Sequence, residues 1–394
     1  MEWIKEIKDR VKKIPIASGR SNKWDKISFD DLVFVPAQLA KKPIDYFRDE
    51  ISAKTIIGKN SKKPIELETP ILIGAMSFGA LSKEAKTALA KASALAGTIE
   101  NTGEGGMLPE EREFSKYLIV QYSTARFGIT EEILKKADAI EIKIGQGAKP
   151  GQGGLLPKEK VTEEIAEIRK IEKGKDVHSP PYHPDIKNIE DLKEKVRWLR
   201  EVTGGKPIII KLGAGDVEND VSLAVEANPD IIAIDGIEGG TGAAPEVMLD
   251  EVGIPALAAL ARAREVLDKI KAPQELWIGG GFNKGGDFAK ALALGADAVF
   301  TAFPLMVAMG CTYCKLCYLG KCPVGIATQD EVLRKKLDME AAPHIANFIK
   351  NCTEEIKMVA GACGKNNIHN LTKNDLRALT SDMAKITGVP FVSK

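Results

Sequence analysis

Short apolar runs recur along the chain from about residue 70, and each leads into glycine, serine or threonine. About eight such runs can be distinguished, at 70–79, 97–106, 117–124, 139–147, 206–215, 230–240, 275–282 and 297–304. A run such as "IIIK" is apolar at almost every position, which is typical of strands buried on both faces of a parallel sheet. No two-residue hairpin turn joins one run to the next. The pattern therefore predicts parallel strands.

Amphipathic segments alternate with these runs and predict helices at 82–95, 131–137, 190–202, 217–227, 254–271 and 286–294. Eight βα units that close on themselves form a (β/α)8 TIM barrel, so we expect an α/β protein of this architecture. A doubly wound open sheet is the alternative. It usually has fewer strands and often carries G-x-G-x-x-G after the first strand, a motif that "GAMSFG" does not match.

The remaining segments predict the domain organisation. Residues 1–69 form an N-terminal extension that wraps the barrel, and residues 70–305 form the barrel itself. A long insertion, 146–189, follows the fourth strand, and loops of that length are usually functional or lid-like. A cysteine-rich loop is expected at 306–330 and a C-terminal helical segment at 331–394. The charged stretch Met1–Glu6 predicts an amphipathic helix and not a signal peptide.

Composition restricts the class of partner. The formal net charge is +1, which gives no electrostatic reason to expect nucleic acid or an anionic membrane as a partner. No apolar run approaches the roughly 18 residues that span a bilayer. We expect a cytoplasmic protein, in which thiols stay reduced and disulfides are rare.

Four of the six cysteines lie close together, as Cys311-x2-Cys314-x2-Cys317-x4-Cys322, followed by proline. Zinc sites usually combine one C-x2-C pair with a second pair some distance away. This spacing instead resembles the bacterial ferredoxin run C-x2-C-x2-C-x3-C-P with one extra residue in the last gap. An iron–sulfur cluster is therefore favoured over zinc. The other two cysteines, Cys352 and Cys363, are expected to be ordinary buried thiols.

The loop "GGGFNKGGD" (279–287) follows the seventh predicted strand. Barrels commonly bind phosphate in the loops after strands seven and eight, and glycine lets backbone N–H groups approach a ligand closely. We expect a phosphate-bearing cofactor near Gly280, Gly281 and the N–H groups after Phe300. A tight turn without a ligand is the alternative.

Lys211 ends an otherwise apolar strand, so its ammonium needs an anionic partner at the barrel mouth. Two partners remain open. One is a flavin, whose N1/O2 region gains negative charge on reduction, and the other is a barrel acid such as Glu141 or Asp235.

Charged and polar residues on neighbouring strand ends would suit a dicarboxylate substrate, because carboxylates favour paired cationic donors. They are Glu104, Arg126, Lys143, Gln146 and Lys149. His183 is expected to be structural. With only four histidines in the chain, no histidine-based metal centre or catalytic triad is expected.

Several motifs together resemble the FMN-binding synthase domain of glutamate synthase. They are "GAMSFGALS" (74–82), "NTGEGG" (101–106), "ARFGIT" (125–130), "EIKIGQGAKPGQGGLLP" (141–157), "SPP" with "HPDI" (179–186), "IEDL" (189–192), "GGTGAAP" (239–245) and "CPVGIATQD" (322–330). The resemblance extends to about residue 360. The strand-seven loop departs from the family pattern, as does Ile237-Glu238 before "GGTGA".

The resemblance implies a barrel that holds FMN and one iron–sulfur cluster and forms L-glutamate from 2-oxoglutarate and ammonia through 2-iminoglutarate. Electrons would pass from a donor through the cluster to FMN. By motif, the implied catalytic residues are Glu104, Lys143 and Lys211, and the implied substrate-binding residues are Arg126, Gln146 and Lys149. The implied cofactor-binding residues are Met76, Ser77, Gln121, Lys211, Gly240, Thr241, Gly280, Gly281, Thr301 and Ala302.

No cysteine precedes Cys311, so we expect no glutaminase in this chain. Ammonia would come from solution or from a separate glutamine amidotransferase subunit, and electrons from a ferredoxin or NAD(P)H-dependent subunit. Two alternatives stay open. The chain would make N-methylglutamate from methylamine, or it would serve a larger complex as an electron-transfer subunit without substrate chemistry of its own.

The family's three-iron cluster is held by a C-x5-C-x4-C pattern, which Cys311, Cys317 and Cys322 match. Cys314 is then an additional thiol, and as a fourth ligand it would give a [4Fe–4S] cluster. We favour the four-iron cluster, with [3Fe–4S] as the alternative.

Overall fold

The computed structural model describes residues 4, 7–8, 10–11, 13–21, 23 and 27–393. The helix expected at Met1–Glu6 lies outside the described residues apart from Ile4. None of the helices in the described part of the chain combines the length and the apolar composition that a membrane crossing requires.

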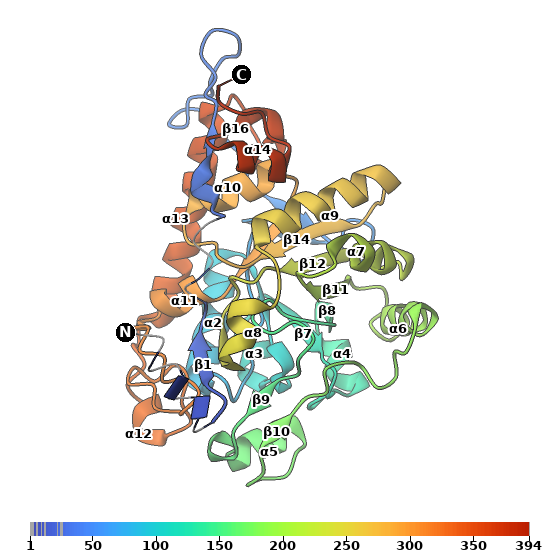
Figure 1. The fold of residues 1–394 in the computed structure, drawn as a ribbon, viewed down its shortest axis with the longest axis vertical. Coiled ribbons are helices and arrows are strands. Elements are labelled where there is room, and N and C mark those ends of the chain that lie inside the picture. Colours follow the sequence, from blue (N-terminus) through green and yellow to red (C-terminus); the bar gives the residue numbers. More distant parts are fainter. Residues whose placement is uncertain are drawn as a thin grey trace.

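Eight parallel strands form the centre of the molecule (Figure 1). They are β5 (Ile71–Ile73), β6 (Ile99–Asn101), β7 (Tyr117–Tyr122), β8 (Ala139–Lys143), β11 (Ile208–Gly213), β12 (Ile231–Asp235), β14 (Glu275–Gly279) and β15 (Ala298–Thr301). Each lies inside one of the eight apolar runs, so the predicted strands and the predicted barrel are confirmed.

The ring of strands is interrupted once. The strand order is β5-β15-β14-β12-β11-β8-β7-β6, and β5 does not pair with β6 within the described sheet. Two hydrogen bonds near the start of the strands join the edges instead. Thr98 Oγ1 donates to the carbonyl oxygen of Ile71 at 2.7 Å, and the N–H of Glu68 donates to the carbonyl oxygen of Gly97 at 2.9 Å. The barrel is therefore nearly closed, with a gap between its first and second strands.

Helices surround the strands, and the six predicted ones are all present within one or two residues of their expected ends. The helices of the barrel are α2 (Lys83–Ala96), α3 (Pro109–Phe114), α4 (Glu131–Lys136), α6 (Ile189–Val202), α7 (Val217–Glu226), α8 (Glu246–Glu251), α9 (Ala256–Ile270), α10 (Gly285–Ala293) and α11 (Phe303–Ala308). Local signals set their ends. In α2, Ser82 Oγ accepts the N–H of Ala85, and Gly97 ends the helix in the left-handed conformation.

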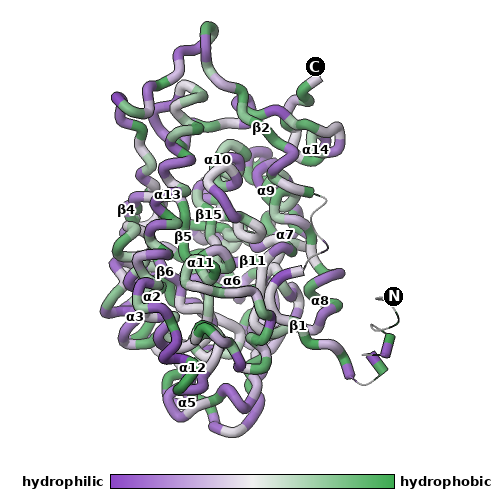
Figure 2. Tube along the Cα trace, turned by 90° about the vertical axis from the view of Figure 1, so that its left-hand side faces the viewer, coloured by the Kyte–Doolittle hydropathy of each residue, from purple (hydrophilic) through white to green (hydrophobic). Residues whose placement is uncertain are grey.

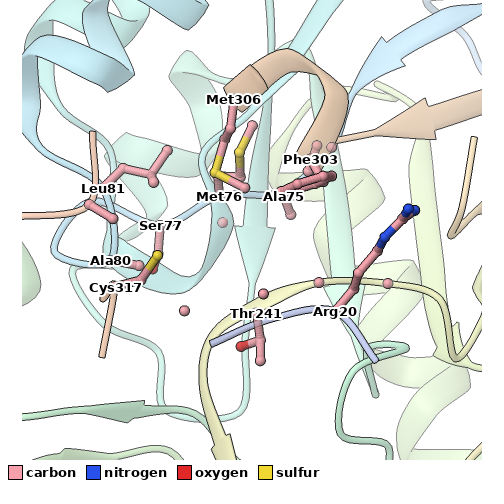
Figure 3. Close-up of a pocket in the computed structure, with 18 of the residues that line it drawn as sticks. Arg20, Ala75, Met76, Ser77, Ala80, Leu81, Thr241, Phe303, Met306 and Cys317 are labelled. Atoms are coloured by element: carbon pink, nitrogen blue, oxygen red, sulfur yellow. The ribbon is translucent and has the colours of Figure 1, made fainter. Parts of the chain in front are cut away.

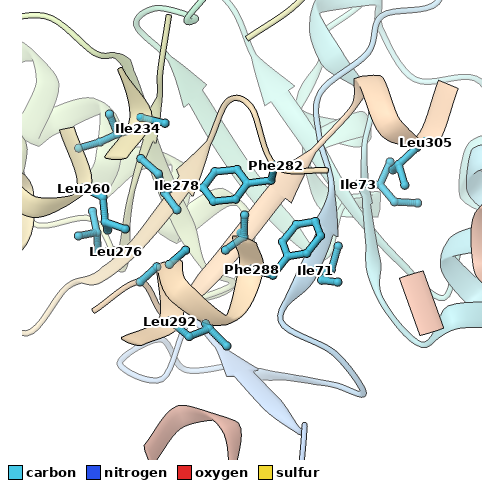
Figure 4. Packing of buried hydrophobic residues seen from close by; sticks show 14 of the residues in the cluster. Ile71, Ile73, Ile234, Leu260, Leu276, Ile278, Phe282, Phe288, Leu292 and Leu305 are labelled. Atoms are coloured by element: carbon cyan, nitrogen blue, oxygen red, sulfur yellow. The ribbon is translucent and has the colours of Figure 1, made fainter. Parts of the chain in front are cut away.

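Apolar side chains fill the space between strands and helices. Figure 4 shows Ile278 beside Phe282 and Ile71 beside Phe288, and all four are at most 1% exposed. Along the outer helices, hydrophobic and hydrophilic stretches alternate (Figure 2), as expected for helices with one buried face. This packing fixes the strand ends that carry the polar residues.

The N-terminal extension closes the end of the barrel at which the strands begin. Its hairpin, β3 (Thr55–Ile57) with β4 (Ile65–Leu67), places Ile57 and Leu67 against Trp277 in one buried cluster. At the other end, β1 (Ile16–Gly19) pairs with β13 (Thr241–Pro245) beside the strand ends. The extension therefore contacts both ends of the barrel.

The C-terminal segment is mainly helical but includes one strand. Its helices are α12 (Glu331–Arg334), α13 (Ala341–Ala362) and α14 (Ser381–Thr387). The strand β16 (Leu376–Ala378) pairs antiparallel with β2 (Leu32–Phe34) of the N-terminal extension. Helix α13 packs along α2 and α10 and forms one side of the molecule in Figure 1. Cys352 and Cys363 lie in and after α13 and are buried, as expected.

The insertion carries short elements of its own: β9 (Leu155–Leu156), α5 (Glu163–Arg169) and β10 (Val177–His178). Strands β9 and β10 pair antiparallel. Figure 1 shows these elements together at the lower end of the view, beside β1.

Candidate active site

One cavity lies where the carboxyl ends of the strands meet the insertion, the N-terminal extension and the cysteine-containing loop. It brings together all but one of the predicted site residues: Met76, Ser77, Glu104, Gln121, Lys143, Gln146, Lys149, Lys211, Gly240, Thr241, Gly280, Gly281, Thr301, Ala302, Cys311, Cys314, Cys317 and Cys322. Figure 3 shows Met76, Ser77 and Thr241 around this space, with Cys317 beside Ala80. The exception is Arg126.

Glu104 and Lys143 form an ion pair inside the cavity. Lys143 Nζ lies 2.9 Å from Glu104 Oε2, and the two side chains are only 13% and 16% exposed. Burial alone would raise the pKa of Glu104, but the charge and hydrogen bond of Lys143, helped by Lys149 and Arg169, lower that pKa to about 2. Glu104 is therefore ionised at neutral pH.

Lys149 is almost fully buried, and its ammonium donates to the carbonyl oxygen of Ala243 at 3.0 Å. Burial, reinforced by the nearby charge of Lys143, lowers the pKa of Lys149 to about 8. A group with this pKa can release a proton near neutral pH. The cavity thus contains a lysine, Lys149, with a pKa close to neutral pH, and a carboxylate, Glu104, that stays ionised.

Lys211 is buried without a hydrogen-bond acceptor among the described residues. Its ammonium lies 4.6 Å from the ring centroid of Phe300 and 4.0 Å from Asp235 Oδ2, beyond hydrogen-bond distance. Asp235 Oδ2 instead accepts the N–H of Gly147 at 2.9 Å. Of the two barrel acids considered as partners, Asp235 is therefore near, whereas Glu141 accepts a hydrogen bond from Gln121 Nε2 at 2.6 Å.

The glycine loop after β14 lines the cavity and packs tightly against the loop after β12. Gly280 and Gly281 have φ values of 105° and 81°, in the region that side chains avoid. A Cβ at Gly280 would lie 3.1 Å from the backbone of Gly236, and one at Gly281 would lie 3.1 Å from Glu238. Thr301 Oγ1 donates to the carbonyl oxygen of Phe282 at 3.3 Å and fixes the loop to β15. Only glycine fits at these two positions, and with no side chain of their own they present bare backbone to the cavity.

Arg126 lies behind the cavity wall. Its guanidinium faces His183 Nδ1 at 2.7 Å, pairs with Asp185 and donates to the carbonyl oxygen of Ser123. It also stacks over Tyr122, with 3.8 Å from Cζ to the ring centroid. The guanidinium of Arg126 therefore contacts other protein groups and does not line the cavity. Its predicted contact with substrate stays a prediction.

The four clustered cysteines are free thiols that follow α11 and line the cavity. Cys322 is buried and Cys314 is exposed at the rim. Burial, with charge repulsion from its neighbours Cys322 and Cys311, raises the pKa of Cys317 to about 11. Within the described part of the chain, no three histidine, cysteine or acidic side chains are arranged to hold a metal ion.

Three charged residues that the sequence did not single out also belong here. Lys160, 5% exposed, donates to the carbonyl oxygens of Ala80 (3.0 Å) and Cys317 (3.4 Å). Arg169 donates to Ser77 Oγ at 3.3 Å. Both come from a part of the insertion that is rich in charged residues, so no sequence signal marked them.

The third is Glu238, in the stretch that departs from the family pattern. Burial raises the pKa of its carboxyl to about 7, although Oε2 accepts the N–H of Ala256 at 2.9 Å. The only sequence signal for Glu238 was that Ile237-Glu238 departs from the family pattern before "GGTGA".

Comparison with solved structures places the barrel among known folds. The chain aligns with lactate oxidase from Pediococcus acidilactici with a TM-score of 0.60 and 17% identity, over 95% of this chain and 93% of that one. The flavin-binding domain of flavocytochrome b2 from baker's yeast gives a TM-score of 0.61 at 17% identity, over 94% and 82%. At this identity the likeness shows the fold.

Comparison with known sequences is more specific. A glutamate synthase large subunit-like protein of Rhizobium meliloti is 42% identical over 394 residues, which cover 95% of this chain and 89% of that protein. An archaeal glutamate synthase [NADPH] of Methanocaldococcus jannaschii is 42% identical, over 91% and 77%. The family described as "Conserved region in glutamate synthase" matches residues 2–366. The chain therefore belongs to the glutamate synthase family.

Proposed function

We propose that this chain catalyses the reductive amination of 2-oxoglutarate to L-glutamate through 2-iminoglutarate, with FMN bound in the cavity. Membership of the glutamate synthase family makes the chain an oxidoreductase that acts on CH–NH2 groups. The observation that carries the proposal is the convergence of Lys143, Lys149 and Lys211 on one cavity that also holds the glycine loop.

The residues present fit FMN. Lys211 is a buried ammonium without a hydrogen-bond acceptor among the described residues, which suits the N1/O2 edge of an isoalloxazine ring. Gly280 and Gly281 line the cavity without side chains, so their backbone N–H groups would be accessible to the phosphate. Met76, Ser77, Gln121, Gly240, Thr241, Thr301 and Ala302 would contact the remainder of the cofactor. When bound, FMN supplies the hydride that reduces the imine carbon.

Lys143, Gln146 and Lys149 would bind the carboxylates of 2-oxoglutarate, because cationic donors in a partly buried site pair strongly with carboxylates. Glu104 pairs with Lys143 and is ionised. It would therefore accept a hydrogen bond from the substrate nitrogen that becomes the amino group of glutamate. Lys149 Nζ, with a pKa of about 8, is the group that would exchange a proton with the substrate.

The four cysteines would hold an iron–sulfur cluster beside the cofactor. Their support is the donor set: four soft thiols on one short loop that lines the same cavity. A separate subunit, either a ferredoxin or an NAD(P)H-dependent protein, would deliver electrons to this loop, where Cys314 is exposed. Ammonia would come from a separate glutamine amidotransferase.

The proposal predicts glutamate formation from 2-oxoglutarate, ammonia and a chemical reductant under anaerobic conditions, measured by amino-acid analysis of the FMN-loaded protein. A parallel reaction supplies methylamine and glutamate and monitors N-methylglutamate. If only the second reaction gives product, the methylamine alternative is correct. If neither does while FMN remains bound and reducible, the chain is an electron-transfer subunit and the proposal is wrong.

Cys314 decides the cluster type. We expect Cys314→Ala to convert an EPR-silent oxidised [4Fe–4S] cluster into one with a strong oxidised three-iron signal, because one ligand is lost. EPR of the anaerobically purified protein measures this, and Cys352→Ala, a buried thiol in α13, is the control that leaves the spectrum unchanged. A strong three-iron signal already present in the unaltered protein, and the same in Cys314→Ala, would contradict the four-iron assignment.

A further inference from the structure

The insertion returns to the barrel through a short segment, Ser179–Asp185, that contacts both members of the Glu104–Lys143 pair. On the Glu104 side, Ser179 Oγ donates to Glu104 Oε2 at 3.3 Å and accepts the N–H of Gly154 at 2.7 Å. Thr124 Oγ1 donates to the carbonyl oxygen of Pro180 at 2.7 Å and ties the segment to the end of β7. The segment is therefore fixed on the side where Glu104 lies.

On the Lys143 side the contact is made by His183, which is only 2% exposed. His183 Nε2 lies 2.8 Å from the carbonyl oxygen of Lys143, and Nδ1 lies 2.7 Å from Arg126 NH1. A guanidinium can only donate, so Nδ1 is the acceptor. The ring proton is then on Nε2, which donates to the carbonyl of Lys143. Both ring nitrogens are used and the tautomer is fixed.

The groups around His183 reinforce this arrangement. Asp185 pairs with Arg126 and with Lys195 Nζ (2.8 Å), so the guanidinium is held against Nδ1. The imidazole is stacked on Tyr122 of β7 with 6.1 Å between ring centroids and 12° between planes. Burial and the charge of Arg126 lower the pKa of His183 to about 4, which keeps the ring neutral and the tautomer in place at neutral pH.

Resting on the proposed function, we propose that His183 is a positioning residue that sets the end of β8 and thereby holds Lys143 Nζ against Glu104 in the geometry that binds the carboxylate of 2-oxoglutarate. Arg126 acts through His183 in the same role. The two ends of one short segment thus fix the two members of the ion pair, so the fold of the insertion determines the geometry of the site. A displacement of about 1 Å in such a site is enough to weaken binding and turnover severely.

His183→Phe keeps a flat ring for Tyr122 but removes both hydrogen bonds, whereas His183→Gln retains a donor for the carbonyl of Lys143. We expect the Phe variant to raise the Kd of 2-oxoglutarate, measured by calorimetry on the oxidised holoprotein, by about 10-fold or more. Its KM for 2-oxoglutarate should rise in parallel while its KM for ammonia stays the same. The Gln variant should recover most of the affinity. Tyr182→Phe, an exposed neighbour in the same segment, is the matched control.

The inference is wrong if the Phe variant binds 2-oxoglutarate within twofold of the unaltered protein, or if the Gln variant binds as weakly as the Phe variant. If His183→Phe does not fold, Ser179→Ala tests the other end of the segment, and an unchanged Kd there overturns the inference. If the unaltered protein binds no 2-oxoglutarate, it is the proposed function that fails. Crystal structures then test the positioning role, because an Nζ–Oε2 distance that stays at 2.9 Å in His183→Phe overturns it.

Discussion

Lys143→Met is expected to lower kcat/KM for 2-oxoglutarate by about 150-fold, equivalent to about 3 kcal/mol, because it truncates one partner of a buried, hydrogen-bonded charge pair. Two effects contribute. The substrate loses a cationic donor, and Glu104 is left without the ammonium that lies 2.9 Å away. Anaerobic steady-state kinetics with saturating ammonia and reductant measure the change.

The same variant should also change the pH dependence. Burial is the largest influence on Glu104 and acts to raise its pKa, and Lys143 is the main influence that lowers it to about 2. Without Lys143 the pKa of Glu104 rises, so activity that remains should be lost on acidification at a higher pH than in the unaltered protein. Lys187→Met is the control, because Lys187 is an exposed lysine of the insertion that follows β8. A loss below about fivefold with normal FMN content would contradict the role of Lys143 in substrate binding.

Lys86→Met should be among the most destabilising single substitutions in the molecule. Lys86 Nζ, fully buried in α2, lies 3.0 Å from Glu100 Oε1 and 2.8 Å from Glu111 Oε1, and all three side chains are 0% exposed. The substitution removes the ammonium that contacts both buried carboxyl groups. Loss of one partner from a buried ion pair costs about 3–5 kcal/mol. The free energy of unfolding, from denaturant titration, should fall by that amount. Lys135→Met, in an exposed pair with Glu131, should change it by about 0.5 kcal/mol or less.

Stability should also depend on pH through this cluster. Burial raises the pKa of Glu100 from 4.5 to about 8 despite the charge of Lys86. Between these values the folded protein binds a proton that the unfolded chain has released, so the free energy of unfolding falls as pH rises from about 5 to about 8.

A Lys86→Met protein that unfolds at the same denaturant concentration as the unaltered protein would show that the ion cluster does not stabilise the fold.

The barrel was predictable because a strand buried on both faces leaves an unbroken apolar run in the sequence. All eight strands lie within such runs. The pairing of β2 with β16 was not predictable in the same way. Each strand has only three residues, and their pairing joins segments that are more than 300 residues apart, which no local pattern encodes.

The candidate site was predictable to the extent that it lies on strand ends, because the carboxyl ends of parallel strands converge whatever the loops do. Lys143, Lys211 and Glu104 follow this rule. Arg126 does not, since its backbone takes a left-handed conformation with φ of 57° and its side chain lies behind the wall. Lys160 and Arg169 come from the insertion, whose path over the barrel depends on tertiary contacts that no local pattern encodes.

The gap between β5 and β6 has a mechanical consequence. Around the rest of the ring, neighbouring strands share ladder hydrogen bonds. At this seam two bonds near the start of the strands join the edges, from Thr98 Oγ1 to the carbonyl oxygen of Ile71 and from the N–H of Glu68 to the carbonyl oxygen of Gly97. Beyond the strands, the loop after β5 packs directly against the loop after β6, because a Cβ at Gly103 would lie 2.6 Å from Ser77 N and one at Gly105 would lie 2.6 Å from the carbonyl oxygen of Phe78. The cavity end of the seam is therefore held by close backbone packing and not by a strand ladder. A side chain at Gly103 or Gly105 would push the two loops apart and displace the part of the cavity wall that carries Met76, Ser77 and Glu104.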